Sequence, residues 1–177
     1  MSQQHLVDDL KQHIASGHVV VVVGTGVSVA TCENQQVEGF QVATWTGLLK
    51  HGVHFCQHTE SVLEADEAQL LEMQINLGKT DFLISAAEFV TERLRGKRLG
   101  AFRGWLKESI GKLAPTQPDI IQTLASWPAK LATLNYDRLL EAVTSRPPIT
   151  WQDRDKIEDV LRYGGDAVIH LHGYFDQ

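Results

Sequence analysis

Cysteine is scarce in this sequence, and long apolar runs are missing. Only Cys32 and Cys56 occur in 177 residues, and they form no Cys-x-x-Cys pair, which excludes a structural zinc module built on paired cysteines. Two cysteines and no signal peptide indicate a reducing cytosol. No apolar run approaches the roughly 18 residues of a membrane-spanning helix, so we expect a cytoplasmic location and no membrane partner.

Positive charge is also in the minority. Lys and Arg number 16 against 22 Asp and Glu, a formal net charge of −6, which argues against direct nucleic-acid binding as the main function. Hydrophobic residues make up 43% and charged residues 21% of the sequence, as in an ordinary globular domain that buries one sizeable core.

The first candidate site follows a run of five valines, Val19–Val23. Five β-branched residues in succession predict the central strand of a parallel sheet, buried on both faces. At Gly24 and Gly26 the absence of a Cβ lets backbone N–H groups approach an anion, and Ser28 can cap a helix or contact a phosphate. The alternative is a tight turn without a ligand, since Val29 stands where the dinucleotide fingerprint has its third glycine.

The second candidate site follows a short apolar strand, 130–134. Apolar residues at helical spacing predict a helix over 136–143, so Asn135 falls at the strand-to-helix turn. Asn135 either caps this helix or reaches into the crevice at the carboxyl ends of the strands. Asp137, in the first predicted helical turn, either complements the helix dipole or belongs to the same site.

The third candidate site lies at the end of a predicted strand over 167–171. His170 and His172 share one face of this strand unless it has ended by position 172. A His at the carboxyl end of a strand suits acid–base chemistry because imidazole titrates near neutral pH. The alternative is a structural His bonded to the backbone.

Taken in order, these motifs resemble the sirtuin-like superfamily, and most of all its bacterial branch whose domains hydrolyse NAD in antiphage defence. The matching segments are Gly-Thr-Gly-Val-Ser at 24–28, a Trp with paired Leu at 45–49, Asn-Tyr-Asp-Arg-Leu-Leu-Glu at 135–141 and Leu-His-Gly at 171–173. The implied NAD-binding residues are Gly24, Thr25, Gly26, Val27, Ser28, Tyr136 and Asp137, and the implied catalytic residues are Asn135 and His172. His170 has no counterpart in this pattern, so we treat it as a neighbour of the site residues and not as one of them.

Two departures from the deacetylating sirtuins bear on the reaction. Their paired cysteines after the His-Gly motif are missing, and Thr31 to Thr44 replaces their Gly-Ile-Pro-Asp-Phe-Arg-like stretch with a polar segment. Both departures favour NAD hydrolysis over peptide deacylation. NAD is then a substrate, and the reaction needs neither a metal nor a second cofactor.

A helical insertion is expected over 44–127, as a lid or an oligomer surface. Predicted helices cover 46–57, 61–77, 81–95 and 100–113, with a short helix from 118 to about 126, and predicted parallel strands lie near 18–23, 130–134, 148–151 and 167–171. The fold class is therefore α/β, a three-layer Rossmann-like parallel sheet with a helical insertion. The resemblance implies that residues 1–177 are the N-terminal part of a longer sirtuin-like protein.

Two further clusters allow other interpretations. His51, His54 and His58 lie on one predicted helix face near Cys56 and could bind a metal, but no carboxylate partner is evident at matching spacing, and we predict no metal site. The basic residues between 93 and 103 could bind an anion, although a solvated helix end explains them better.

The function that the resemblance implies is cleavage of NAD to nicotinamide and ADP-ribose by the effector of an abortive-infection system. A homo-oligomer and a phage-protein or defence-system partner are expected with it. The alternatives are an NAD-dependent protein deacylase or ADP-ribosyltransferase, and a catalytically inactive module that senses NAD or ADP-ribose through assembly.

Overall fold

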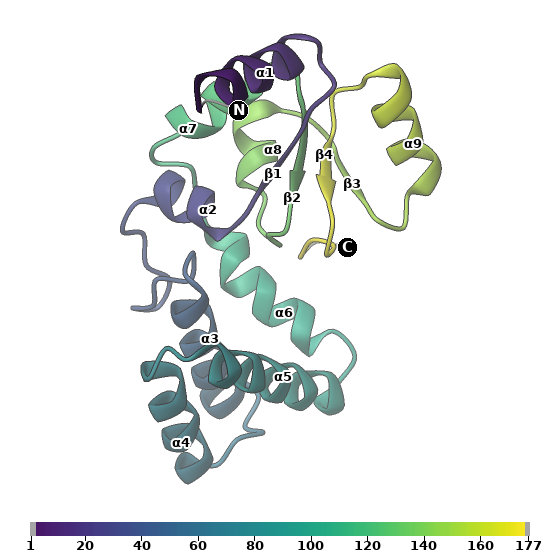
Figure 1. Ribbon diagram of the computed structural model, residues 1–177. Coiled ribbons are helices and arrows are strands. Elements are labelled where there is room, and N and C mark those ends of the chain that lie inside the picture. The colour runs from purple at the N-terminus through teal and green to yellow at the C-terminus, as the bar shows by residue number, and fades with distance from the viewer. Residues whose placement is uncertain (1–2, 176–177) are drawn as a thin grey trace. The chain divides into compact units, whose positions relative to one another are not determined.

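The chain forms two compact units in the computed structural model, which describes residues 3–175. One unit joins the segment up to Glu33 with Ala114–Phe175, and the other comprises Asn34–Leu113. Figure 1 shows that the first contains the sheet and the second is helical. The compact helical unit thus begins earlier and ends earlier than the insertion expected over 44–127. The segment after Leu113 belongs to the sheet unit because its helix α7 (Asp119–Ala125) packs against α2 (Thr25–Cys32) and α8 (Leu139–Thr144).

Four parallel strands form the sheet, in the order β1-β2-β4-β3. They are β1 (Val20–Val23), β2 (Lys130–Thr133), β3 (Pro148–Thr150) and β4 (Val168–His170), all within the predicted ranges. Helices flank the sheet: α1 (Gln3–Ala15), α2 (Thr25–Cys32), α7 (Asp119–Ala125), α8 (Leu139–Thr144) and α9 (Arg154–Tyr163). The predicted α/β class with a parallel sheet is confirmed, and the arrangement is compatible with a Rossmann-like fold.

The two inner strands, β2 and β4, are buried on both faces. Leu131, Ala132 and Thr133 are all buried, and so is every residue of β4. Because successive strand residues face opposite sides, burial of each one requires cover on both faces of the sheet. On one face, Val160 of α9 packs into a cluster with Ala132 and Ile169.

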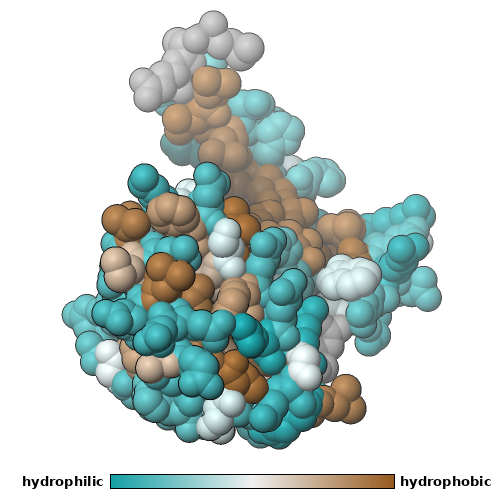
Figure 2. All heavy atoms as spheres, turned by 90° about the horizontal axis from the view of Figure 1, so that it is seen from below, coloured by the Kyte–Doolittle hydropathy of each residue, from teal (hydrophilic) through white to brown (hydrophobic). Residues whose placement is uncertain are grey.

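The valine run does not form the central strand, so that prediction was wrong. β1 lies at one edge of the sheet, and Val20 and Val22 are 44% and 53% exposed. Figure 2 shows hydrophobic residues at the surface among hydrophilic ones on the face that it draws. A run of β-branched residues reports strand propensity, whereas burial depends on which elements cover the strand.

The second unit consists of helices at the predicted places. They are α3 (Trp45–His54), continued by a π-helix (Phe55–Thr59), then α4 (Ala65–Asn76), α5 (Thr80–Lys97), α6 (Ala101–Glu108) and a 3₁₀ turn (Ile110–Lys112). Gly52 lets α3 approach its neighbours closely, since a Cβ there would lie 2.8 Å from Trp105 of α6 and 2.9 Å from Val90 of α5.

Candidate functional site

The three candidate motifs follow neighbouring parallel strands at the carboxyl ends of those strands, which we call the carboxyl edge of the sheet. Val23 of β1 pairs with Thr133 of β2, and Thr133 pairs with His170 of β4, so these strands end level with one another (Figure 1). Neighbouring strands lie about 4.8 Å apart. The turns after β1, β2 and β4 therefore start side by side, at the edge where open parallel sheets bind ligands.

A hydrogen-bonded network joins the first two turns. The Ser28 hydroxyl donates to Asp137 Oδ2 over 2.7 Å and accepts from Asn135 Nδ2, also over 2.7 Å. Ser28 and Asp137 are both buried. The structure thus brings three of the expected site residues together across more than a hundred positions of sequence, and each fixes the orientation of the next.

Asn135 is not a helix cap, and the helix after it begins later than predicted. Helix α8 starts at Leu139, not near position 136, and the Asn135 amide binds Ser28 instead of a helical N–H. The Leu139 N–H donates to Asp137 Oδ1 over 3.1 Å. This short loop, in which an Asp side chain accepts from the N–H two residues on, competes with the helix and delays its start.

Burial sets the electrostatics of this network. It raises the pKa of the Asp137 carboxyl above its ordinary value, while the hydrogen bonds from Ser28 and from the Leu139 N–H act in the opposite direction. Burial, with a smaller contribution from Asp137, raises the pKa of the nearby Cys32 thiol to about 11. A thiol with that pKa is protonated at neutral pH, so Cys32 is not a nucleophile of this site.

The glycine-containing loop leaves space beside the start of α2. Helix α2 begins at Thr25, directly after Gly24, and Gly26 lies in its first turn. Neither glycine has a positive φ, so the backbone conformation does not require them. A Cβ built at Gly24 or Gly26 would meet no heavy atom within 4 Å among the described residues, and Thr25 beside them is exposed. The loop thus offers an open approach to the N-terminus of α2, where backbone N–H groups favour anions.

The two histidines of the third motif lie in different environments. His170 is fully buried: its Nδ1 lies 3.1 Å from the Asn135 carbonyl oxygen, and its Nε2 lies 2.7 Å from Glu141 Oε1. His172 is exposed and makes no hydrogen bond to Asn135 within the described part of the chain. Strand β4 ends at His170, so the alternation that would place both on one face stops before His172.

The remaining expected NAD-binding residues lie around the network. Val27 is half-buried and its N–H donates to the Gly24 carbonyl over 3.0 Å. The Tyr136 side chain is 36% exposed, and its carbonyl accepts from the Phe175 N–H over 3.1 Å. This last bond ties the end of the described chain to the Asn135 turn.

Sequence reasoning missed the pair formed by His170 and Glu141. A usable signal was present, because a His that continues a buried strand needs a polar partner. The partner itself could not be identified, since Glu141 lies in a helix 29 positions earlier and only the fold brings the two together.

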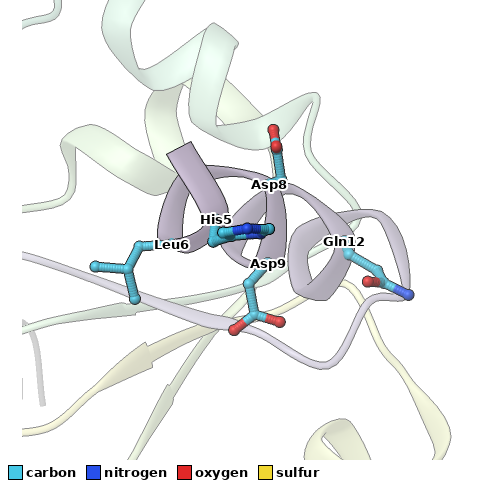
Figure 3. Close-up of a pocket in the computed structure, with 5 residues that line it drawn as sticks. All are labelled: His5, Leu6, Asp8, Asp9 and Gln12. Carbon is cyan, nitrogen blue, oxygen red and sulfur yellow. The ribbon is translucent and has the colours of Figure 1, made fainter. Parts of the chain in front are cut away.

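A hollow of about 580 Å³ lies along α1, away from these motifs in sequence. Its lining residues are His5, Leu6, Asp8, Asp9 and Gln12. All come from one helix, and Figure 3 shows that their side chains diverge, with Asp8 and Asp9 pointing in opposite directions. Diverging side chains of a single helix enclose no ligand, so this hollow is not a site of the kind expected.

In the helical unit, the histidine cluster does gain a carboxylate neighbour. Glu38 Oε2 lies 3.6 Å from His51 Nε2 and 4.0 Å from His54 Nδ1. Even so, the described residues contain no group of three or more His, Cys, Asp or Glu side chains placed to hold a metal ion. His51 Nδ1 accepts instead from the Trp105 indole N–H over 3.2 Å.

The basic residues of the same unit pair with acids and rings. Arg93 donates to Glu67 over 2.9 Å, and Arg98 Nε donates to the buried Glu60 over 3.1 Å. The Arg95 guanidinium lies 4.8 Å from the centre of the Phe102 ring. These contacts occupy the three side chains within the fold, which argues against an anion site at the basic residues between 93 and 103.

Searches against family models, curated proteins and solved structures return no match for this chain. Among the helices of the described residues, none has the length and apolar character needed to span a membrane. The geometry at the carboxyl ends of β1, β2 and β4 is therefore what indicates a function.

Proposed function

We propose that this chain hydrolyses NAD to nicotinamide and ADP-ribose at the carboxyl edge of its sheet. The observation that carries the proposal is the network of Ser28, Asn135 and Asp137. It fixes the uncharged Asn135 amide in the turn after β2, which lies between the turns after β1 and β4. The Asn135 Nδ2 is committed to Ser28. Its Oδ1 is then available to accept a hydrogen bond from a water molecule or a ribose hydroxyl.

The reaction suits such a site. Water adds to the anomeric carbon of the ribose as the bond to the nicotinamide nitrogen breaks, and one proton is released. The sugar passes through a cation-like state, so an amide that orients the water without adding a charge helps more than a cation would. His172, in the exposed turn after β4, is the proposed acceptor of the water's proton.

The loop at 24–28 is the proposed place for the pyrophosphate. A Cβ at Gly24 or Gly26 would meet no heavy atom within 4 Å among the described residues, so neither glycine obstructs an anion, and the first turn of a helix presents N–H groups that favour one. NAD therefore fits as a substrate spanning two turns, with phosphates at α2 and the nicotinamide ribose near Asn135.

The broader identity that goes with this reaction is also proposed. The motif order supports a three-layer, Rossmann-like, sirtuin-like domain acting in the cytoplasm as the effector of an abortive-infection defence, regulated by homo-oligomerisation or by a phage-derived partner. One observation favours a second candidate, a module that binds NAD without cleaving it. His172 is exposed, and the hydrogen-bond partners of Asn135 are Thr133, Ser28 and His170, so no hydrogen bond among the described residues holds His172 beside the Asn135 amide.

NAD turnover by the purified protein tests these alternatives. We expect free nicotinamide and ADP-ribose from NAD alone, and a loss of about 100-fold or more in kcat for Asn135→Ala and His172→Ala. His5→Ala, which removes another exposed His of the sheet unit, is the matched control and should keep full activity. Product release only with an acylated peptide would indicate deacylation, and saturable binding without products would indicate the sensing module.

A further inference from the structure

His170 and Glu141 form a buried polar pair directly behind the Asn135 turn. His170 is the last residue of β4 and has no exposed surface, and Glu141, in α8, is 7% exposed. The ring of Tyr174 lies 5.2 Å from the His170 ring, and Asp137 is the other acid close enough to interact with both members of the pair. Both residues are thus buried, although each carries a polar side chain.

The hydrogen bonds of His170 fix the hydrogen on Nδ1 and place one shared proton between Nε2 and Glu141. The Asn135 carbonyl oxygen can only accept, so His170 Nδ1, 3.1 Å away, must carry a hydrogen and donate it. The 2.7 Å contact between His170 Nε2 and Glu141 Oε1 then holds one proton, on either side. In both cases the pair has no net charge, which makes its burial affordable in a low-dielectric environment.

The consequence is that Asn135 is held at three points. Its N–H donates to Thr133 Oγ1 over 3.0 Å, its side chain donates to Ser28, and its carbonyl accepts from His170. The first two contacts come from the strand before it and from α2. The third acts on the carbonyl of the peptide that leads on to Tyr136, and among the described residues Glu141 is the hydrogen-bond partner of the other ring nitrogen of His170.

We propose that His170 and Glu141 act as positioning residues that hold the Asn135 main chain, and with it the Asn135 amide, in the orientation that the NAD ribose requires. This inference rests on the proposed NAD hydrolysis. It assigns His170 a role through Asn135, in contrast to the direct role of His172. Loss of the pair should lower kcat and leave KM nearly unchanged, because the pyrophosphate loop at 24–28 is untouched.

Steady-state kinetics on Glu141→Leu and Glu141→Gln provide the test. The Gln amide can donate to the Nε2 lone pair and keep the ring in place, so we expect kcat within about threefold of the wild type. Leu cannot, and we expect kcat to fall about 100-fold with KM within about threefold, as for a misplacement of about 1 Å. Glu60→Leu is the matched control, because Glu60 is also 7% exposed but lies in the helical unit; it should cost stability without this loss of kcat.

The outcomes separate the two proposals. No turnover by the wild type overturns the proposed hydrolysis and this inference with it, whereas equal turnover by the wild type and a folded Glu141→Leu overturns this inference alone. Nitrogen-15 NMR of the imidazole in the wild-type protein gives a second test that needs no variant to fold. The inference requires a hydrogen on His170 Nδ1, and an unprotonated Nδ1 would overturn it.

Discussion

Replacing Ser28 by Ala removes the centre of the network at the carboxyl edge. The change deletes one hydroxyl that donates to Asp137 and accepts from Asn135, both over 2.7 Å. Because Ser28 is 3% exposed and Asp137 8% exposed, water cannot readily replace the missing group. Asp137 Oδ2 loses its donor, and Asn135 loses the acceptor that fixes its amide.

The size of the effect follows from the two bonds. A hydrogen bond to a charged group contributes about 1.5–3 kcal/mol and a neutral one about 0.5–1.5 kcal/mol, so Ser28→Ala should lower the free energy of unfolding by about 3 kcal/mol. The loss should shrink as the pH is lowered. Burial already raises the pKa of Asp137, and the missing donor harms its ionised form more than its protonated form.

Activity should fall with stability but for a separate reason. An Asn135 amide that is free to rotate loses the near-attack geometry, which we expect to cost about 100-fold in kcat. Urea unfolding monitored by circular dichroism measures the change in the free energy of unfolding, and the rate of nicotinamide release measures the change in kcat.

Thr31→Val is the matched control for this experiment. Thr31 lies in the same helix, has no exposed surface, and its Oγ1 has no hydrogen-bond partner among the described residues. Replacing that hydroxyl by a methyl should leave stability unchanged or raise it. If Ser28→Ala costs less than about 0.5 kcal/mol, or no more than Thr31→Val, the network does not hold the site together and the reasoning fails.

Three further predictions concern a glycine, a histidine and the cysteines. Gly26→Ala should raise the free energy of unfolding by up to about 1 kcal/mol, since Ala favours a helix. It should also raise the KM for NAD at least about tenfold, because the methyl group would occupy the space of the proposed phosphate site, and an unchanged KM would argue against that site. Burial lowers the pKa of His51, so the unfolded chain takes up a proton that the native chain excludes, and stability should fall as the pH drops below 6.5; urea titrations should show a smaller fall for His51→Asn. Burial raises the pKa of the Cys32 and Cys56 thiols to about 11, so iodoacetamide at pH 8 should label neither in the native protein and both after denaturation, as mass spectrometry would show.

Local patterns predicted the elements of this fold well. The strands at 20–23, 130–133, 148–150 and 168–170 and the helices of the second unit fall where apolar spacing placed them. Such patterns record how a segment presents its apolar side chains, which is a local property. The α/β class followed because parallel strands alternated with helices along the chain.

Relations between distant segments were not predictable in the same way. The valine run was expected at the centre of the sheet, but β1 pairs only with β2 within the described sheet. The start of α8 was missed because Asp137 offers its carboxylate to the Leu139 N–H, a competing local bond that apolar spacing does not report. Likewise, the motifs indicated Ser28 and Asn135 separately, and only the pairing of β1 with β2 brings them into contact.

The end of β4 decides which His of the third motif can face a ligand. Every residue of β4 is buried, and His170, opposite Thr133 of β2, is the last residue of the strand. The Leu171 N–H still donates to the Thr133 carbonyl over 2.9 Å, which anchors the chain just before it turns. His172 therefore follows a fixed point yet lies beyond the strand, exposed, while His170 faces inward to the Asn135 carbonyl. The proposed division between an inner, positioning His and an outer, reacting His thus depends on where β4 ends.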